Sequence, residues 1–242
     1  MTHALYLDDS YLKEFDAKVE KVINQDGKVF AILTQTAFYP SSGGQPCDTG
    51  KLIRKSDNSE FKVIFVARRD GQILHEIDGP NELKEGIEVR GFINWERRYK
   101  LMRAHTSAHV VSGLINKETG AKITGNQIEL DKIRIDFELE NFNKDTFIKY
   151  IEMCNEVIAK DYPITNYYIS REEAEKDPSL AKLATGLPPG LKEIRIVDIV
   201  GFDKQADGGT HVKSLKEVGR LEFIRCDNKG KNNRRIYYRL VE

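Results

Sequence analysis

Two histidines stand four positions apart in the stretch RAHTSAHVVSG, residues 103–113. If this stretch is helical, His105 and His109 lie on one face about one turn apart, roughly 6 Å, and both imidazoles can reach one metal ion. Zinc takes nitrogen, sulfur or carboxylate ligands in a tetrahedron, so a further ligand must come from elsewhere in the chain. Taken alone, such a pair more often lies on a protein surface or in a hydrogen-bonded core.

Asp207 and His211, whose side chains can also bind a metal ion, stand four positions apart in KQADGGTHVKSL, residues 204–215. Gly208 and Gly209 allow a tight backbone path between them. The alternative is an ordinary turn between two strands. Three of the chain's five histidines fall in these two motifs, and this joint occurrence favours a metal site. The candidate ligands are His105, His109, Asp207 and His211.

The elements that must position these residues are a helix and several strands. Apolar residues recur at helical spacing in 95–120, and this segment ends at a glycine, which predicts a long amphipathic helix. A second helix is predicted within 143–161. Strand patterns surround them in QIEL, KIRIDFEL, PITNYYIS, EIRIVDIV, LEFIRC and RRIYYRL. Helices mixed with mostly antiparallel strands indicate an α+β domain over 92–242.

The N-terminal part has a different pattern. Short β-rich runs, EFDAKVEKVI, KVFAILTQT, EFKVIFVARR and QILHEI, are separated by turn signals. This predicts a small all-β module, a barrel or compact sheet, over 1–91.

Composition sets broad limits on function. The chain has 242 residues, 38 basic and 38 acidic, so any nucleic-acid contact must come from a local basic surface. Its three cysteines form no CxxC pair, which argues against a disulfide framework. The first residues lack the apolar run of a signal peptide, and no stretch is apolar enough to span a membrane. We therefore expect a cytoplasmic protein with no membrane contact.

RAHTSAHV, DGGTHV and KEVGR together resemble the editing domain of alanyl-tRNA synthetase and its free-standing relatives, the AlaX trans-editing proteins. TAFYPSSGGQPCDTG, residues 36–50, is similar to the glycine-rich segment of the β-barrel that precedes this domain in the family. The barrel and the chain length resemble the medium-length AlaX type most closely. The resemblance implies an α+β fold in which a small β-barrel is followed by an editing domain like that of threonyl- and alanyl-tRNA synthetases.

The same resemblance implies an enzyme that hydrolyses the ester of tRNA(Ala) mischarged with serine or glycine, at one Zn²⁺ per chain. His105, His109 and His211 match the family's zinc ligands. Asp207 stands where the family pattern CGGTH has a cysteine. A carboxylate is a harder ligand than a thiolate, which leaves open a weaker zinc site, another divalent ion, or a role for Asp207 away from the metal.

Two further residues are candidates for the catalytic site. Thr106, beside His105, is expected to line the amino-acid pocket, and Gln127 to contribute an amide to it. The alternative for Thr106 is a helix residue bonded to its own turn. A pocket that binds the serine hydroxyl would spare alanyl-tRNA, because a site built for a hydroxyl rejects analogues lacking it by about 10⁴-fold.

Glycines and basic residues could contact tRNA. Glycines let a backbone approach a phosphate closely, and clustered arginines and lysines suit phosphate contacts. The alternatives are a structural turn and a solvated charged face. The candidates are Gly43, Gly44, Arg97, Arg98, Lys229, Lys231, Arg234 and Arg235. The rival function is a non-enzymatic tRNA-binding module with a structural metal, and a hydrolase of another small ester is a third alternative.

Overall fold

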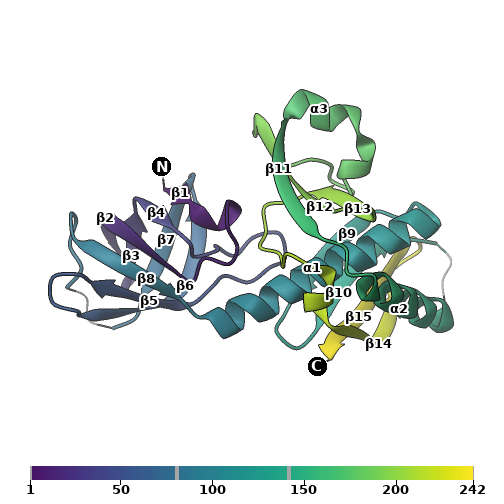
Figure 1. The fold of residues 1–242 in the computed structure, drawn as a ribbon, viewed down its shortest axis with the longest axis horizontal. Helices are drawn as coiled ribbons and strands as arrows, with labels where there is room; N and C mark the ends of the chain where they lie inside the picture. Colours follow the sequence, from purple (N-terminus) through teal and green to yellow (C-terminus); the bar gives the residue numbers. More distant parts are fainter. Residues whose placement is uncertain (1, 80–81, 141–142, 242) are drawn as a thin grey trace. The chain divides into compact units, whose positions relative to one another are not determined.

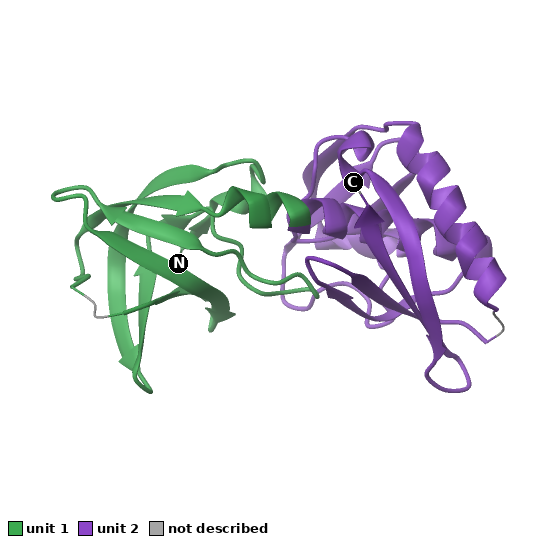
Figure 2. Cartoon of the chain, turned by 90° about the horizontal axis from the view of Figure 1, so that it is seen from below, with its two compact units in different colours: residues 1–100 green, residues 101–242 purple. Residues whose placement is uncertain are grey.

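The structure, a computed structural model, describes residues 2–79, 82–140 and 143–241. Two compact units divide the chain at Lys100 (Figure 2). The long helix α1 (Trp95–Thr119) begins in the first unit and continues in the second. The predicted fold class, a small β-barrel followed by an α+β unit, is confirmed. The predicted domain limits, 1–91 and 92–242, stay a prediction.

Six antiparallel strands close the first unit into a barrel in the order β2-β3-β7-β6-β5-β8 (Figure 1). Closure pairs both edges of every strand, so that no edge is left open. The short strands β1 (His3–Ala4) and β4 (Gln35–Thr36) pair outside the barrel. The barrel strands are β2 (Glu14–Gln25), β3 (Lys28–Leu33), β5 (Gly50–Arg54), β6 (Glu60–Arg69), β7 (Gln72–Ile77) and β8 (Glu88–Ile93).

The sequence did not predict β5 and β8, and both contain glycine at a crowded position. A Cβ atom at Gly91 would overlap the ring of Phe15, and one at Gly50 would overlap the Phe92 carbonyl. A strand with such a glycine has a weak alternation of side chains, because the glycine serves close packing and contributes no side chain.

His75 is buried with its polar atoms satisfied in the barrel unit. Its Nε2 lies 2.8 Å from the Thr36 hydroxyl, and its Nδ1 lies 3.0 Å from the Ala31 carbonyl oxygen. Burial lowers the pKa of His75 from 6.5 to about 4, because the charged imidazolium loses its hydration there. His75 is therefore neutral at pH 7.

The second unit holds two antiparallel sheets with α1 between them (Figure 1). The four-stranded sheet has the order β14-β15-β10-β9, and the three-stranded sheet has the order β11-β12-β13. Helix α2 (Lys144–Ala159) packs on β14, and α3 (Arg171–Lys176) follows β11. The strands are β9 (Ile123–Ile128), β10 (Ile133–Glu138), β11 (Ile164–Ser170), β12 (Glu193–Ile199), β13 (Asp203–Ala206), β14 (Arg220–Asn228) and β15 (Asn233–Val241).

Local signals fix both ends of α1. The side chain of Asn94 accepts a hydrogen bond from the Arg97 N–H at 3.2 Å, as an N-cap residue does. Gly120 ends the helix in the left-handed region, at φ 74°, and its N–H donates to the Asn116 carbonyl. The predicted helix is present, and most of its side chains from Leu101 onward are buried, so it is a core element with a less amphipathic character than predicted.

None of the helices within the described part of the chain combines the length and the apolar composition needed to cross a membrane.

We predict that His75 makes stability fall at acidic pH. The unfolded chain binds a proton on this residue near pH 6.5 and the folded chain only near pH 4, so stability is lost as pH falls through this window. The loss reaches about 3 kcal/mol below pH 4. Urea unfolding of the wild type and of His75→Gln between pH 7 and pH 4 measures it. Equal pH dependence in the two proteins would contradict the prediction.

Candidate metal centre

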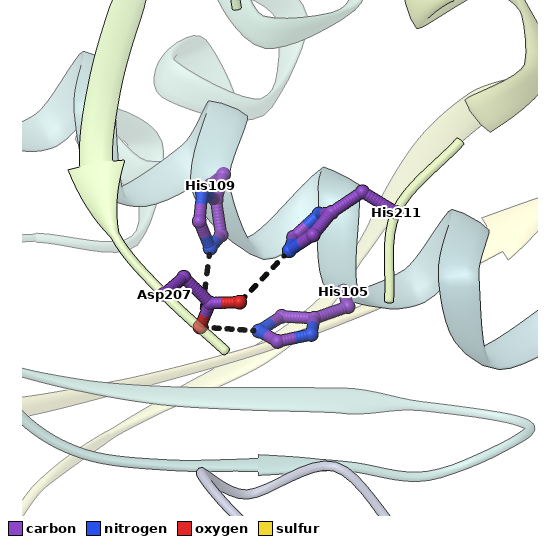
Figure 3. A group of neighbouring side chains, drawn as sticks. All are labelled: His105, His109, Asp207 and His211. Atoms are coloured by element: carbon purple, nitrogen blue, oxygen red, sulfur yellow. Dashed lines mark hydrogen bonds and ion pairs between the residues drawn. The ribbon is translucent and has the colours of Figure 1, made fainter. Parts of the chain in front are cut away.

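Four side chains from two segments of the second unit converge on one point (Figure 3). They are His105 and His109 from α1, and Asp207 and His211 from the loop after β13, and we call them the ligand cluster. One ligand atom from each lies within 4.8 Å of the others. Tetrahedral zinc requires about 3.3 Å between ligand atoms, so the side chains would draw closer around a bound ion. The distant motifs predicted to meet do meet.

The carboxylate of Asp207 lies among the three imidazoles. Its Oδ2 is 3.0 Å from Nε2 of His211. Its Oδ1 is 3.5 Å from Nε2 of His105 and 3.8 Å from Nε2 of His109. The same nitrogen of each ring thus faces the carboxylate, which is the arrangement expected of side chains that share one cation.

Burial disfavours the charged form of two imidazoles of this site, those of His105 and His211. The side chains of His105, His109 and His211 are each at most 7% exposed. Burial lowers the pKa of His105 from 6.5 to about 4 and also lowers the pKa of His211. Burial alone would raise the pKa of the Asp207 carboxyl, but the neighbouring histidines, His105 first, hold it well below its usual value. Neutral imidazoles and an ionised carboxylate are the forms that bind metal.

Thr106 contacts the candidate ligand His211. Its side chain is fully buried, and its hydroxyl oxygen lies 3.1 Å from Nδ1 of His211. The same oxygen accepts a hydrogen bond from the Val212 N–H at 3.3 Å. A partner on the second ring nitrogen is what orients a metal-ligating histidine. The predicted role of Thr106 in lining an amino-acid pocket stays a prediction, and these contacts point to support of His211.

A buried polar network ties β13 to α1 beside His109. Gln205 donates to the His109 carbonyl at 3.3 Å and to the Ser112 hydroxyl at 3.1 Å. It also donates to Asp203, which forms a buried ion pair with Lys182 at 3.1 Å. The network fixes the strand that leads into Asp207 against the helix that carries the histidines. Among the residues here, sequence reasoning missed Gln205, for which no local signal exists.

The loop of Asp207 packs directly against His105. The Gly209 N–H donates to Oδ2 of Asp207. A Cβ atom at Gly209 would overlap the Cε1 and Nδ1 atoms of His105, whereas one at Gly208 would meet nothing within 4 Å. Arg195 of β12 donates to the carbonyls of Asp207 and Gly209. Sequence reasoning missed Arg195 too, although a lone basic residue between isoleucines in EIRIVDIV was a usable signal.

Gln127 lies elsewhere in the second unit. It is exposed on β9, where it donates to Glu129 at 2.6 Å. It lines a cavity of about 220 Å³ over the four-stranded sheet, together with Arg134, Arg225 and Tyr237 among others. The structure therefore does not bring Gln127 into the ligand cluster, and its catalytic role stays a prediction that this position argues against.

The predicted tRNA contacts of the first unit differ in exposure. Gly43 and Gly44 form a tight turn, at φ 57° and 84°, between the bridged residues Ser42 and Gln45. Arg97 is partly exposed and donates to the Cys47 carbonyl at 3.0 Å. Arg98 is fully buried, as is Asp48, with which it forms an ion pair.

Arg98 holds the start of α1 within the first unit. Besides Asp48, its guanidinium donates to the carbonyls of Ala37 and Ser10. A phosphate contact by Arg98 stays a prediction that this complete burial argues against.

The basic residues of the second unit also divide into two kinds. Lys229 and Lys231 are exposed in the hairpin between β14 and β15. Arg234 is only 9% exposed and donates to main-chain carbonyls, among them that of Gly230. Arg235 is partly exposed and forms a bidentate pair with Asp136, with both distances 2.7 Å. The two lysines therefore offer the more available charge, and burial argues against Arg234 as a phosphate contact.

Comparison with known proteins gives matches along the whole chain. Residues 10–97 match the family described as tRNA synthetases class II (A). Residues 194–237 match the threonyl and alanyl tRNA synthetase second additional domain.

Full-length relatives are similar to this chain. One is the alanyl-tRNA editing protein AlaX-M of Methanosarcina barkeri, 51% identical over 246 residues and covering 100% of both chains. Another is the AlaX-M protein of Saccharolobus solfataricus, 44% identical over 239 residues and covering 98% of each chain. The alanine–tRNA ligase of Pyrococcus abyssi is 38% identical over 229 residues, which are 93% of this chain and 24% of the ligase.

We predict that the two glycines of the ligand loop respond differently to substitution. Gly209→Ala should lower zinc affinity at least tenfold, because its methyl group must displace His105 or the loop. Gly208→Ala, the matched control, should keep affinity within about twofold, since its methyl group has open space. Competition for zinc against a chromophoric chelator measures both. Equal affinities in the two variants would contradict the close contact.

Proposed function

The chain belongs to the family of alanyl-tRNA editing proteins of the AlaX-M type, and we propose that it hydrolyses the ester bond of tRNA(Ala) mischarged with serine or glycine. The expectation of an enzyme agrees with this membership. The observation that carries the proposal is the ligand cluster, in which three buried imidazoles and one partly buried carboxylate lie together.

The donor set suits zinc. Three imidazole nitrogens and one carboxylate oxygen are ligands that zinc accepts in tetrahedral sites. Bound zinc supplies a Lewis acid and lowers the pKa of a water molecule to about 7, which is enough for an aminoacyl ester. His105, His109 and His211 would hold the ion, and Thr106 would keep His211 oriented. No serine or cysteine nucleophile is needed.

Asp207 fits two roles within this proposal. As a fourth ligand it would replace the cysteine of the family pattern, and the ion would have to accept water or substrate in addition to the four side chains. As a hydrogen-bond acceptor beside three histidine ligands, it would hold a water molecule or the amino group of the substrate. We propose the first role, because Oδ1 faces His105 and His109 while Oδ2 faces His211.

We propose that the hydroxyl of the serine ester binds at the ligand cluster. A buried polar group that bonds a hydroxyl discriminates against its absence, so alanyl-tRNA would be spared. For tRNA, we propose contacts by Lys229 and Lys231 to phosphates, with Gly43, Gly44 and Arg97 as further candidates. A cytoplasmic location is part of the proposal.

Deacylation of seryl-, glycyl- and alanyl-tRNA(Ala) by the purified protein tests the proposed hydrolysis. We expect hydrolysis of the seryl or glycyl ester, at least tenfold slower hydrolysis of the alanyl ester, and loss of activity when a chelator removes the metal. Re-addition of zinc should restore activity. Binding of tRNA without any deacylation would instead favour the non-enzymatic module, and activity untouched by chelation would exclude a catalytic metal.

Two substitutions of Asp207 separate its possible roles. Asp207→Asn keeps the shape but removes the charge, so a ligand role predicts at least tenfold weaker zinc binding. Asp207→Cys supplies the thiolate of the family pattern and should bind zinc at least as tightly as the wild type. Chelator competition measures both affinities. Loss of deacylation in Asp207→Asn with unchanged zinc affinity would assign Asp207 a role away from the metal.

A further inference from the structure

Arg195 is a buried charge that the chemistry of the ligand cluster does not itself require. It lies in β12, and its side chain is on the opposite face of the strand from Ile194 and Ile196, which belong to a separate apolar cluster. Only 6% of Arg195 is exposed. Burying a guanidinium is costly unless its hydrogen bonds are made, so the partners of Arg195 indicate why it is there.

The partners of Arg195 are main-chain groups of the loop that carries Asp207. Nη1 of Arg195 donates to the Asp207 carbonyl at 3.1 Å and to the Gly209 carbonyl at 3.1 Å. The carbonyl of Arg195 in turn accepts a hydrogen bond from the Asp207 N–H at 3.1 Å. One residue thus holds the main chain on both sides of Gly208.

The path of this loop is not set by regular secondary structure. Residues 207–210 lie in neither helix nor strand, and a Cβ atom at Gly208 would touch nothing within 4 Å. The direction of the Asp207 carboxylate follows from the backbone at 207–209, because Oδ2 accepts the Gly209 N–H. A small rotation of either peptide would move Oδ1 away from His105 and His109, which it faces at 3.5 and 3.8 Å.

The contacts of Arg195 go to main-chain carbonyls of the loop, so the Asp207 carboxylate keeps its orientation toward the imidazoles. Resting on the metal site proposed above, we propose that Arg195 is a positioning residue that presets the Asp207 loop for metal binding. Its removal therefore weakens metal affinity as well as stability.

The test compares zinc affinity in three variants, measured by chelator competition without tRNA on protein shown to be folded by circular dichroism. Arg195→Met removes the donors and keeps an unbranched apolar side chain, and zinc affinity is expected to fall about 10- to 100-fold. Arg195→Lys restores a donor on a shorter stem and should lie between the wild type and Arg195→Met.

Arg171→Gln is the matched control. Arg171 also clamps a loop of the second unit, because it donates to the carbonyls of Leu191 and Pro188, and it is not part of the ligand cluster. Its variant should lose thermal stability but keep zinc affinity within about twofold.

Zinc affinity of folded Arg195→Met within twofold of the wild type would overturn the positioning role. If Arg195→Met does not fold, Arg195→Lys decides, and an affinity equal to that of the wild type overturns the proposal. A wild-type protein that binds no zinc would overturn the metal site together with this proposal. Failure of deacylation alone would leave the zinc affinities, and therefore the role of Arg195, to be judged separately.

Discussion

The placement of one partly buried carboxylate among three buried imidazoles is the constraint on which the second unit depends. Two of the imidazoles come from consecutive turns of α1, and the other two groups come from a loop far along the chain. A buried carboxylate is stable only when charge or hydrogen bonds compensate its lost hydration. In this protein the Gly209 N–H and the facing imidazoles provide that compensation, and a bound cation would complete it.

Meeting this constraint requires polar groups inside the core. The helix α1 lies between two sheets, and it buries polar side chains such as Thr106, Ser107 and Ser112 besides the two histidines. Gln205 bonds to the main chain at His109, and Thr106 contacts Nδ1 of His211. Because rigid ligands lose less entropy on binding a metal, these contacts favour binding even though burying their polar atoms costs stability.

The first unit also contains buried polar side chains that bond to one another. Its barrel is closed, and some of its buried polar groups are paired, among them Arg98 with Asp48 and His75 with Thr36. These pairs fix loops and the start of α1 in that unit. The barrel therefore presents a rigid frame for the exposed turn at Gly43 and Gly44, whose backbone is left-handed at both residues.

The sequence by itself determined the features that neighbouring residues encode. The spacing of His105 and His109, the glycine that ends α1, and the glycines beside Asp207 all act within a few positions. Local patterns were therefore sufficient to predict the helix and both halves of the ligand cluster. The predicted β-rich runs EFKVIFVARR and QILHEI coincide with β6 and β7 for the same reason. Such signals weaken in short or glycine-containing strands, which is why β5, β8 and β13 were missed.

Only the tertiary structure decided which charged side chains lie on the surface and which are buried in the core. Arg98 and Arg234 have the same appearance in the sequence as solvated basic residues, but their partners lie in distant segments, and both are buried. The same holds for Arg195, whose link to the Asp207 loop depends on the pairing of β12 with β13. The sequence fixes residue types and local spacing, whereas the burial of a charge depends on the three-dimensional position of its partner.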